Sequence, residues 1–197
     1  MEPNLEELRK NYERLDNTKL TRLAIVEAAS LRPEALDLLK QIIKERGLSE
    51  DLDKGIDAQL KKDDPLAIAS YAELLRKLPC PVCGSTDEKL NATMTANVMS
   101  FIIITNYKKQ VVIACPTCLD KQNNDAMLRS ATLGWWGLPW GIIRTVQSLM
   151  LNSKMKKQNH LYEANDTLIN FVSPRLGIIE VNKNSPEQLG AMIGISR

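Results

Sequence analysis

Two cysteine pairs of the same form, "CPVCG" at residues 80–84 and "CPTC" at residues 115–118, stand 31 residues apart in the sequence. Two cysteines three positions apart can hold one ion from a tight turn, and two such turns complete a tetrahedral site of four thiolates. The doubled pattern is typical of a structural zinc site. We therefore expect one zinc ion bound by four ligands, Cys80, Cys83, Cys115 and Cys118.

Other uses of these cysteines are weighed against structural zinc. Four thiolates also suit iron, and the sequence leaves the choice between zinc and iron open. A dithiol redox motif usually appears as one CxxC pair, so the second pair disfavours it. A catalytic zinc ion keeps an open coordination position and usually has a histidine ligand. The sole histidine, His160, has no spacing relation to the cysteines.

The residues around the pairs predict the local fold. Residues 98–114, "VMSFIIITNYKKQVVIA", contain two apolar, β-branched runs around a polar "NYKK" at 106–109, which favours a β-hairpin with its turn there. After Cys118 a helical pattern extends to about Leu133. A cysteine turn, a hairpin, a second cysteine turn and a helix, in this order, are typical of a zinc-ribbon or treble-clef module.

We expect an α+β fold in three segments. Residues 1–78 form a helical region, in which Pro33 starts one helix and Gly47 ends it. Residues 79–152 form the zinc module with a tryptophan-rich helical extension. Residues 153–197 hold a C-terminal helix and a tail with a short strand at 176–181.

All three tryptophans lie in "LGWWGLPWGIIRT", residues 133–145, within a stretch from 126 to 162 that has no acidic residue. Two interpretations remain open. In the first, the rings fill a core over the zinc module, as large side chains do in small domains. Alternatively, they form an interaction surface flanked by basic side chains. The candidate surface residues are Trp135, Trp136, Trp140, Arg144, Lys154, Lys156 and Lys157.

The net charge of the chain restricts the kinds of partner that it could bind. The formal net charge is +2 with neutral thiols, and four thiolates with one divalent ion bring it near zero. A general nucleic-acid footprint is therefore absent, although a basic face could be assembled. Such a face would need Lys89, Lys108, Lys109, Lys121 and Arg129. We expect a protein partner or an anionic membrane surface, and no small-molecule substrate.

The residues predict no enzyme, because they show no nucleophile–base pair, no phosphate-binding glycine loop and no carboxylate cluster with catalytic spacing. Residues 1–15 are charged throughout and do not resemble a signal peptide. Arg144 and Gln147 interrupt the apolar window 132–151, which is therefore a poor transmembrane helix. We expect a soluble, cytoplasmic protein, placed at the inner face of a membrane if the membrane alternative holds.

The cysteine knuckles, the hairpin and "LGWWGLPWGIIRTVQSL" resemble a group of mostly bacterial, uncharacterised zinc-ribbon proteins with a GWWGxPWG segment after the second CxxC. Residues 18–48 are similar to a helical segment found beside such modules and beside membrane proteins in bacteria. The resemblance implies zinc binding by the four cysteines and supplies no activity. The resulting hypothesis is a non-catalytic, zinc-binding scaffold that presents the tryptophan-rich surface to a protein partner. A peripheral membrane protein and a nucleic-acid- or ribosome-associated zinc module are the alternatives.

Overall fold

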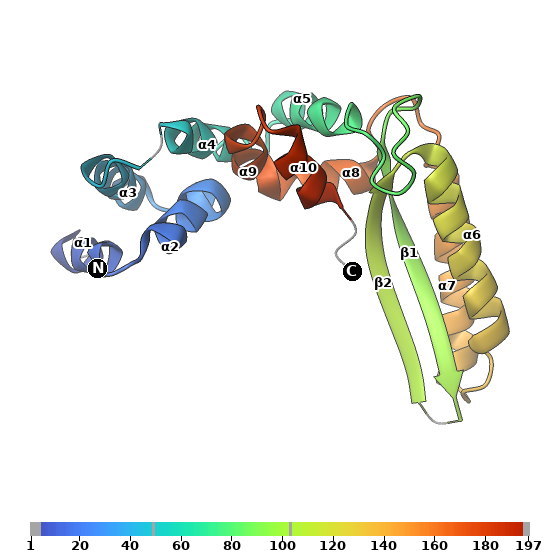
Figure 1. Ribbon diagram of the computed structural model, residues 1–197. Helices are drawn as coiled ribbons and strands as arrows, with labels where there is room; N and C mark the ends of the chain where they lie inside the picture. Colours follow the sequence, from blue (N-terminus) through green and yellow to red (C-terminus); the bar gives the residue numbers. More distant parts are fainter. Residues whose placement is uncertain (1–4, 49, 103, 195–197) are drawn as a thin grey trace. The chain divides into compact units, whose positions relative to one another are not determined.

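The computed structural model describes residues 5–48, 50–102 and 104–194, and they form two compact units (Figure 1). One unit combines the chain up to Tyr71 with Phe171–Leu189. The other combines Ala72–Asn170 with the chain from Gly190 onward. We call them the helical unit and the hairpin unit. Residues 171–189 therefore belong to the same unit as the N-terminal helices, which a division of the sequence into consecutive segments does not show.

The helical unit consists of short α-helices, one π-helical turn and two 3-10 turns. Its elements are α1 (Leu5–Glu13), α2 (Asn17–Arg22), the π-helical η1 (Leu23–Glu27), the 3-10 turn η2 (Ala28–Ser30), α3 (Pro33–Glu45), α4 (Asp51–Gln59), η3 (Ser173–Arg175) and α9 (Leu176–Val181). Three further helices contain residues of both units: α5 (Pro65–Arg76), α8 (Asp166–Val172) and α10 (Pro186–Ile193).

Helix α3 follows the sequence prediction closely. Pro33 occupies its first turn, and Gly47, with φ +61°, follows its end, a conformation that glycine adopts without steric cost. Leu39, Ile42 and Ile43 are buried along one side, where they join the core of the helical unit. The helical interpretation of this segment is confirmed.

The strand expected at 176–181 is wrong, because these residues form helix α9. Isoleucine and valine favour a strand in isolation, but packing decides here. A Cβ atom on Gly177 would lie 2.8 Å from the main-chain oxygen of Gly55, so α9 and α4 approach closely through their glycines. The Gly177 N–H donates to Oε1 of the buried Gln59 over 3.0 Å, and the helix also buries Leu176 and Ile179.

The hairpin unit contains the antiparallel strands β1 (Asn91–Phe101) and β2 (Ile104–Ala114) and the long helices α6 (Pro116–Leu133) and α7 (Trp140–Lys156). Figure 1 shows both helices running alongside the hairpin, next to β1. The hairpin is confirmed, but its turn is not at 106–109. The register pairs Asn91 with Ala114 and Phe101 with Ile104, so "NYKK" lies within β2. The residues at the end of the hairpin are apolar, so a search for a polar turn placed the turn elsewhere.

Side chains of α6 and α7 form hydrogen bonds with main-chain groups on the edge of β1 that faces the helices, where a third strand would otherwise pair. Asn152 of α7 donates from Nδ2 to the carbonyl oxygen of Ala96 (2.8 Å) and accepts at Oδ1 from the Ala96 N–H (3.2 Å). Ser148 donates to the same carbonyl over 2.6 Å, and Ser130 of α6 accepts from the Val98 N–H over 3.1 Å. Because a buried main-chain group without a partner costs about 1–3 kcal/mol, these contacts allow a two-stranded sheet to bury its second edge.

The interior between β1, α6 and α7 is consequently built from small and polar side chains. Glycines bring the two helices together at the far end of the hairpin: a Cβ atom on Gly141 would lie 2.7 Å from the main-chain oxygen of Gly134. This close approach explains glycines in the tryptophan segment that the sequence left unexplained. The buried polar residues of this interior are Thr93, Ser100, Asn123, Ser130, Thr145, Ser148 and Asn152.

Candidate metal centre

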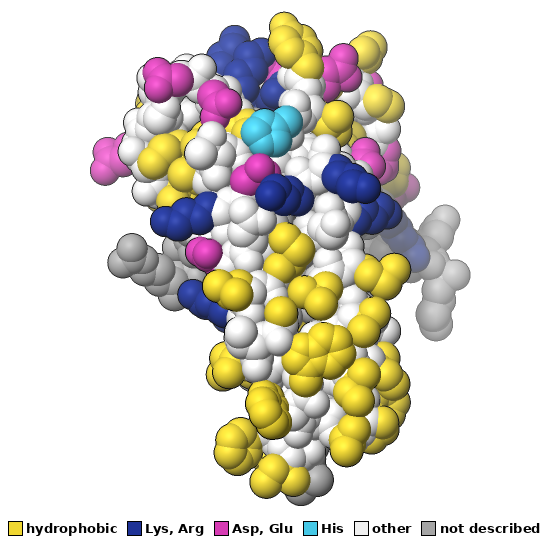
Figure 2. All heavy atoms as spheres, turned by 90° about the vertical axis from the view of Figure 1, so that its right-hand side faces the viewer, with side chains coloured by type: hydrophobic (Ala, Val, Ile, Leu, Met, Phe, Trp, Pro, Cys, Tyr) yellow, Lys and Arg dark blue, Asp and Glu magenta, His cyan; other side chains and the backbone are white. Residues whose placement is uncertain are grey.

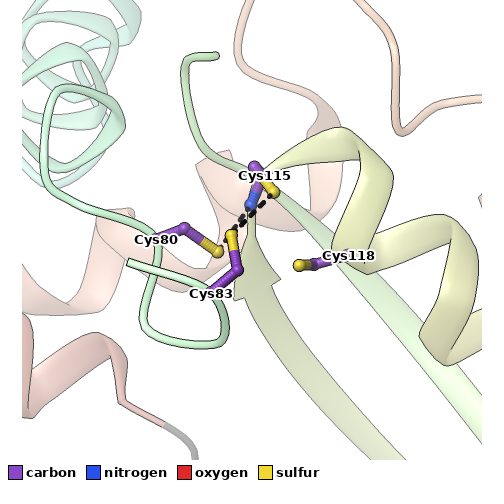
Figure 3. Close-up of side chains that lie close together, drawn as sticks. All are labelled: Cys80, Cys83, Cys115 and Cys118. Carbon is purple, nitrogen blue, oxygen red and sulfur yellow. Dashed lines mark hydrogen bonds between the residues drawn. The ribbon is translucent and has the colours of Figure 1, made fainter. Parts of the chain in front are cut away.

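Four cysteine sulfurs meet at the base of the hairpin, where β2 ends and α6 begins (Figure 3). The Sγ atoms of Cys80, Cys83, Cys115 and Cys118 all lie within 4.8 Å of one another. A tetrahedral zinc ion with Zn–S bonds of about 2.3 Å places its sulfurs about 3.8 Å apart. The Cys83 and Cys115 sulfurs are 3.7 Å apart, which matches that edge and far exceeds a disulfide bond of about 2.05 Å. The geometry is that of four free thiols around a space of ionic size.

A tight turn positions the first pair. The Gly84 N–H donates to the carbonyl oxygen of Cys80 over 2.8 Å, and the Cys80 N–H donates to the Ser85 carbonyl over 2.8 Å. Gly84 has φ +76°, a left-handed conformation that a residue with a Cβ rarely adopts. The glycine in "CPVCG" therefore closes the turn that points both sulfurs of the pair in the same direction.

The start of α6 positions the second pair. Cys115 is the N-cap residue, Pro116 occupies the first turn, and Cys118 lies within that same turn. The Cys115 N–H donates to the sulfur of Cys80 over 3.3 Å, which joins the two pairs directly. Main-chain N–H groups at a helix N-terminus favour negative charge, so this position suits thiolates.

The pKa values of the cysteine thiols show how the cluster responds to negative charge. Burial opposes ionisation of Cys80, but N–H groups of Cys115, Cys83 and Val82 that point at its sulfur outweigh burial and lower its pKa to about 7. Burial, together with the adjacent sulfurs of Cys115 and Cys83, raises the pKa of Cys118 well above its ordinary value. The four sulfurs therefore do not ionise together on their own, and a divalent cation would supply the compensating charge. The cluster could bind a metal ion.

The three tryptophans lie away from this cluster and are exposed, so the interpretation of these rings as core is wrong. Trp135, Trp136 and Trp140 expose 42%, 70% and 60% of their surface. Trp135 and Trp136 instead cap the end of α6: their Nε1–H groups donate to the carbonyl oxygens of Ala131 (2.8 Å) and Thr132 (3.1 Å). A helix end leaves such carbonyls without intrahelical partners. The indole N–H groups of Trp135 and Trp136 are therefore satisfied, while all three ring systems are exposed.

The basic residues of the predicted surface lie along α7. The Arg144 guanidinium stands 5.2 Å from the ring centre of Tyr107 on β2, and it donates to Gln147 over 2.9 Å. Lys156 donates to Asn124 of α6 over 3.0 Å. Lys154 and Lys157 are exposed. Arg144 and Trp140 also line an open groove with Thr105 and Tyr107.

The five lysine and arginine residues considered for nucleic acid are all exposed and come from several elements. Lys89 is engaged with Glu73 over 2.7 Å. Lys108 and Lys109 lie on β2, and Lys121 and Arg129 lie on α6. Lys109 stands 5.6 Å from the ring centre of Tyr107, so it shares this ring with Arg144.

Sequence reasoning missed the largest feature of this surface, an array of exposed apolar side chains beyond the tryptophans. The signal that could have revealed it is the absence of charge from residues 98–107 and 130–143. Besides the tryptophans, the exposed large apolar residues described for the hairpin, α6, α7 and their connection are Met99, Phe101, Ile102, Ile104, Val111, Leu128, Leu133, Leu138, Ile142, Ile143, Val146 and Met150. None of the helices described in this structure combines the length and hydropathy that crossing a bilayer requires.

The fold and site together define a class of protein: a mixed helical protein with a small two-stranded antiparallel sheet and a four-cysteine cluster suited to a metal ion. No protein-family model, no curated protein and no solved structure matches the chain. The resemblance to zinc-ribbon proteins with a GWWGxPWG segment therefore stays a prediction.

Proposed function

We propose that this protein is a non-catalytic scaffold whose four cysteines bind one structural zinc ion. The observation that carries the proposal is the convergence of the four sulfurs within 4.8 Å at the base of the hairpin. Four cysteine thiolates fill a tetrahedral zinc site and leave no coordination position for water or substrate. The ion therefore serves the structure, and we assign it no reaction.

The arrangement of elements favours a treble-clef module. A cysteine turn, the hairpin β1–β2 and helix α6 follow one another, and α6 carries the second ligand pair in its first turn. Zinc would join the turn at Cys80 to the start of α6, and thereby fix the base of the hairpin. Modules of this size bury little apolar surface, so a metal ion replaces part of a hydrophobic core.

The scaffold presents its opposite end as an interaction surface. We define the apolar tip as residues 98–102, 104–107 and 130–143, which comprise the hairpin end, the end of α6 and the start of α7. The seven positions of β1 before Val98 separate the tip from the base, a length of about 24 Å at about 3.4 Å per residue. A metal ion at the base can therefore hold the scaffold without taking part in what the tip binds.

Metal content tests this proposal. We expect the purified chain to contain one zinc ion per molecule, and the Cys83→Ser variant to retain less than about a tenth of it after dialysis against a weak chelator, because three thiolates bind zinc far more weakly than four. Elemental analysis by plasma mass spectrometry measures both. Thr117→Ala, an exposed change between two of the ligands, is the matched control and should keep its zinc. Equal zinc in wild type and Cys83→Ser would contradict the assignment.

A further inference from the structure

The distal half of the hairpin unit has polar side chains inside and apolar side chains outside. Ser100, Ser130, Thr145 and Ser148 are buried in it, whereas Leu138 exposes 74% of its surface. Figure 2 shows this face: hydrophobic side chains cover the hairpin end of the unit, and charged side chains lie only further along it. Water favours the reverse distribution, and contiguous exposed apolar surface marks an interaction site.

The apolar side chains come from every element of the tip. Phe101 lies on β1, Ile104 on β2, Leu133 on α6 and Ile143 on α7, and all four are exposed. A protein partner typically covers one face of a domain, whereas a lipid phase can surround an end from all sides. Helices that pack through glycine, serine and threonine, with apolar residues outward, are typical of proteins in contact with lipid.

The polar groups of the tryptophan segment suit an apolar environment. Nε1–H groups of Trp135 and Trp136 donate to α6 carbonyls, so neither ring needs a polar partner outside the protein. Among the described residues β2 has no strand on its outer edge, and its main-chain groups there require water or lipid headgroups. That requirement limits the tip to the boundary between headgroups and acyl chains, about 5–10 Å deep.

A basic belt borders the tip. Residues 98–107 and 130–143 contain no charged residue, and the next positions along the chain are Lys108, Arg129 and Arg144. Arg144 and Lys109 both stand beside the ring of Tyr107, 5.2 and 5.6 Å from its centre. Four residues of β2, Ile104–Tyr107, separate the strand end from Lys108, or about 14 Å at about 3.4 Å per residue. The belt would thus lie among headgroups when the tip is inserted.

We propose that the apolar tip inserts into one leaflet of an anionic lipid bilayer, with the basic belt bound to the lipid headgroups. The inference rests on the proposed function, because it names the partner of the surface that the zinc-bound scaffold presents. Charge complementarity supports the bilayer over a second copy of the chain: between Asp125 and Glu163 the sequence has only basic charges, which would repel the same surface of another molecule.

Intrinsic fluorescence gives a direct readout, because all three tryptophans of the protein lie in the tip. The full zinc-loaded chain is mixed with vesicles of phosphatidylcholine alone or with 30% phosphatidylserine added. We expect a blue shift of tryptophan emission and flotation with the anionic vesicles, and at least a tenfold weaker partition into neutral ones. Lipids brominated near the headgroup should quench more strongly than lipids brominated near the bilayer centre.

Four variants distinguish insertion of the tip from non-specific adhesion to lipid. Leu138→Asp and Phe101→Asp change exposed tip residues and should each reduce vesicle binding at least tenfold. Leu66→Asp changes a leucine of α5 that is 82% exposed outside the tip, and it should bind like wild type. Lys108→Glu combined with Lys109→Glu should remove the preference for anionic vesicles. Circular dichroism and zinc content verify that each variant is folded.

Several outcomes would overturn the proposal. A folded, zinc-containing protein that neither floats nor shifts its emission would exclude the bilayer and leave the zinc scaffold standing. Dimerisation without lipid that Leu138→Asp abolishes would assign the tip to a second copy. Equal loss of binding in Leu66→Asp would show non-specific adhesion. A metal-free chain that binds vesicles would instead contradict the proposed function.

Discussion

Chelation of the metal is expected to unfold the hairpin unit. Structural zinc in small modules contributes about 10–16 kcal/mol of apparent binding free energy, which equals or exceeds the total stability of a typical domain, about 5–15 kcal/mol. Without the ion, the four sulfurs remain packed together although the pKa of Cys80 is lowered and that of Cys118 is raised, and the turn at Cys80 loses its link to the start of α6. We expect the free energy of unfolding to fall by more than about 5 kcal/mol.

Denaturant titration followed by tryptophan emission measures this loss, because every tryptophan belongs to the hairpin unit. The protein is compared before and after treatment with a strong chelator, and again after one equivalent of zinc is returned. Recovery of the original midpoint on zinc addition distinguishes metal loss from irreversible damage. An unchanged midpoint in metal-free protein would show that the fold does not depend on the ion.

The Asn152→Leu variant is expected to lose about 3 kcal/mol of stability, the second large effect. The Asn152 side chain, fully buried, supplies both a donor and an acceptor to Ala96 and also accepts from Asn123 over 3.2 Å. Leucine has a similar size and no polar group, so the Ala96 N–H and the Asn123 amide would be buried without these contacts. Each such group costs about 1–3 kcal/mol.

Asn124→Leu provides the matched control, because Asn124 lies on the exposed side of α6, where its side chain accepts a hydrogen bond from Lys156. We expect this variant to lose less than about 0.5 kcal/mol, as surface substitutions usually do. Thermal and chemical unfolding of the two variants give the comparison. Similar midpoints for Asn152→Leu and wild type would mean that the edge of β1 does not need its side-chain partners.

The four-cysteine cluster was accessible to sequence reasoning because its chemistry is local. Two cysteines three residues apart, with a glycine at the left-handed position after Cys83, define a metal-binding turn without knowledge of the rest of the fold. The same holds for α3, since Pro33 and Gly47 mark its ends and its apolar spacing marks its buried side. The cysteine cluster and α3, which short sequence patterns encode, were therefore predicted correctly.

Features that depend on distant partners were not. The segment 176–181 is rich in β-branched residues, yet it forms α9 because Gly177 allows close packing on α4, more than a hundred positions earlier. The edge of β1 is satisfied by Asn152, 56 positions from Ala96. No local sequence pattern reveals such a contact.

The exposure of the tryptophans could not be predicted from the sequence either, because a core and an interaction surface would use the same residues. What separates them is the interior: serine, threonine and glycine already fill the space between β1, α6 and α7, and the rings have no room inside. The helix-capping contacts of Trp135 and Trp136 show why two of the rings follow α6 directly. Apolar residues at the end of the hairpin then extend the same surface.

X-ray absorption at the zinc edge of the purified, full-length protein tests the metal assignment most directly, because it measures the ligands of the bound ion. We predict a single shell of four sulfur atoms at about 2.3 Å, with no nitrogen or oxygen ligand. A shell that contains histidine nitrogen or water oxygen, or a protein that folds fully without any metal, would contradict the four-cysteine centre on which the scaffold depends.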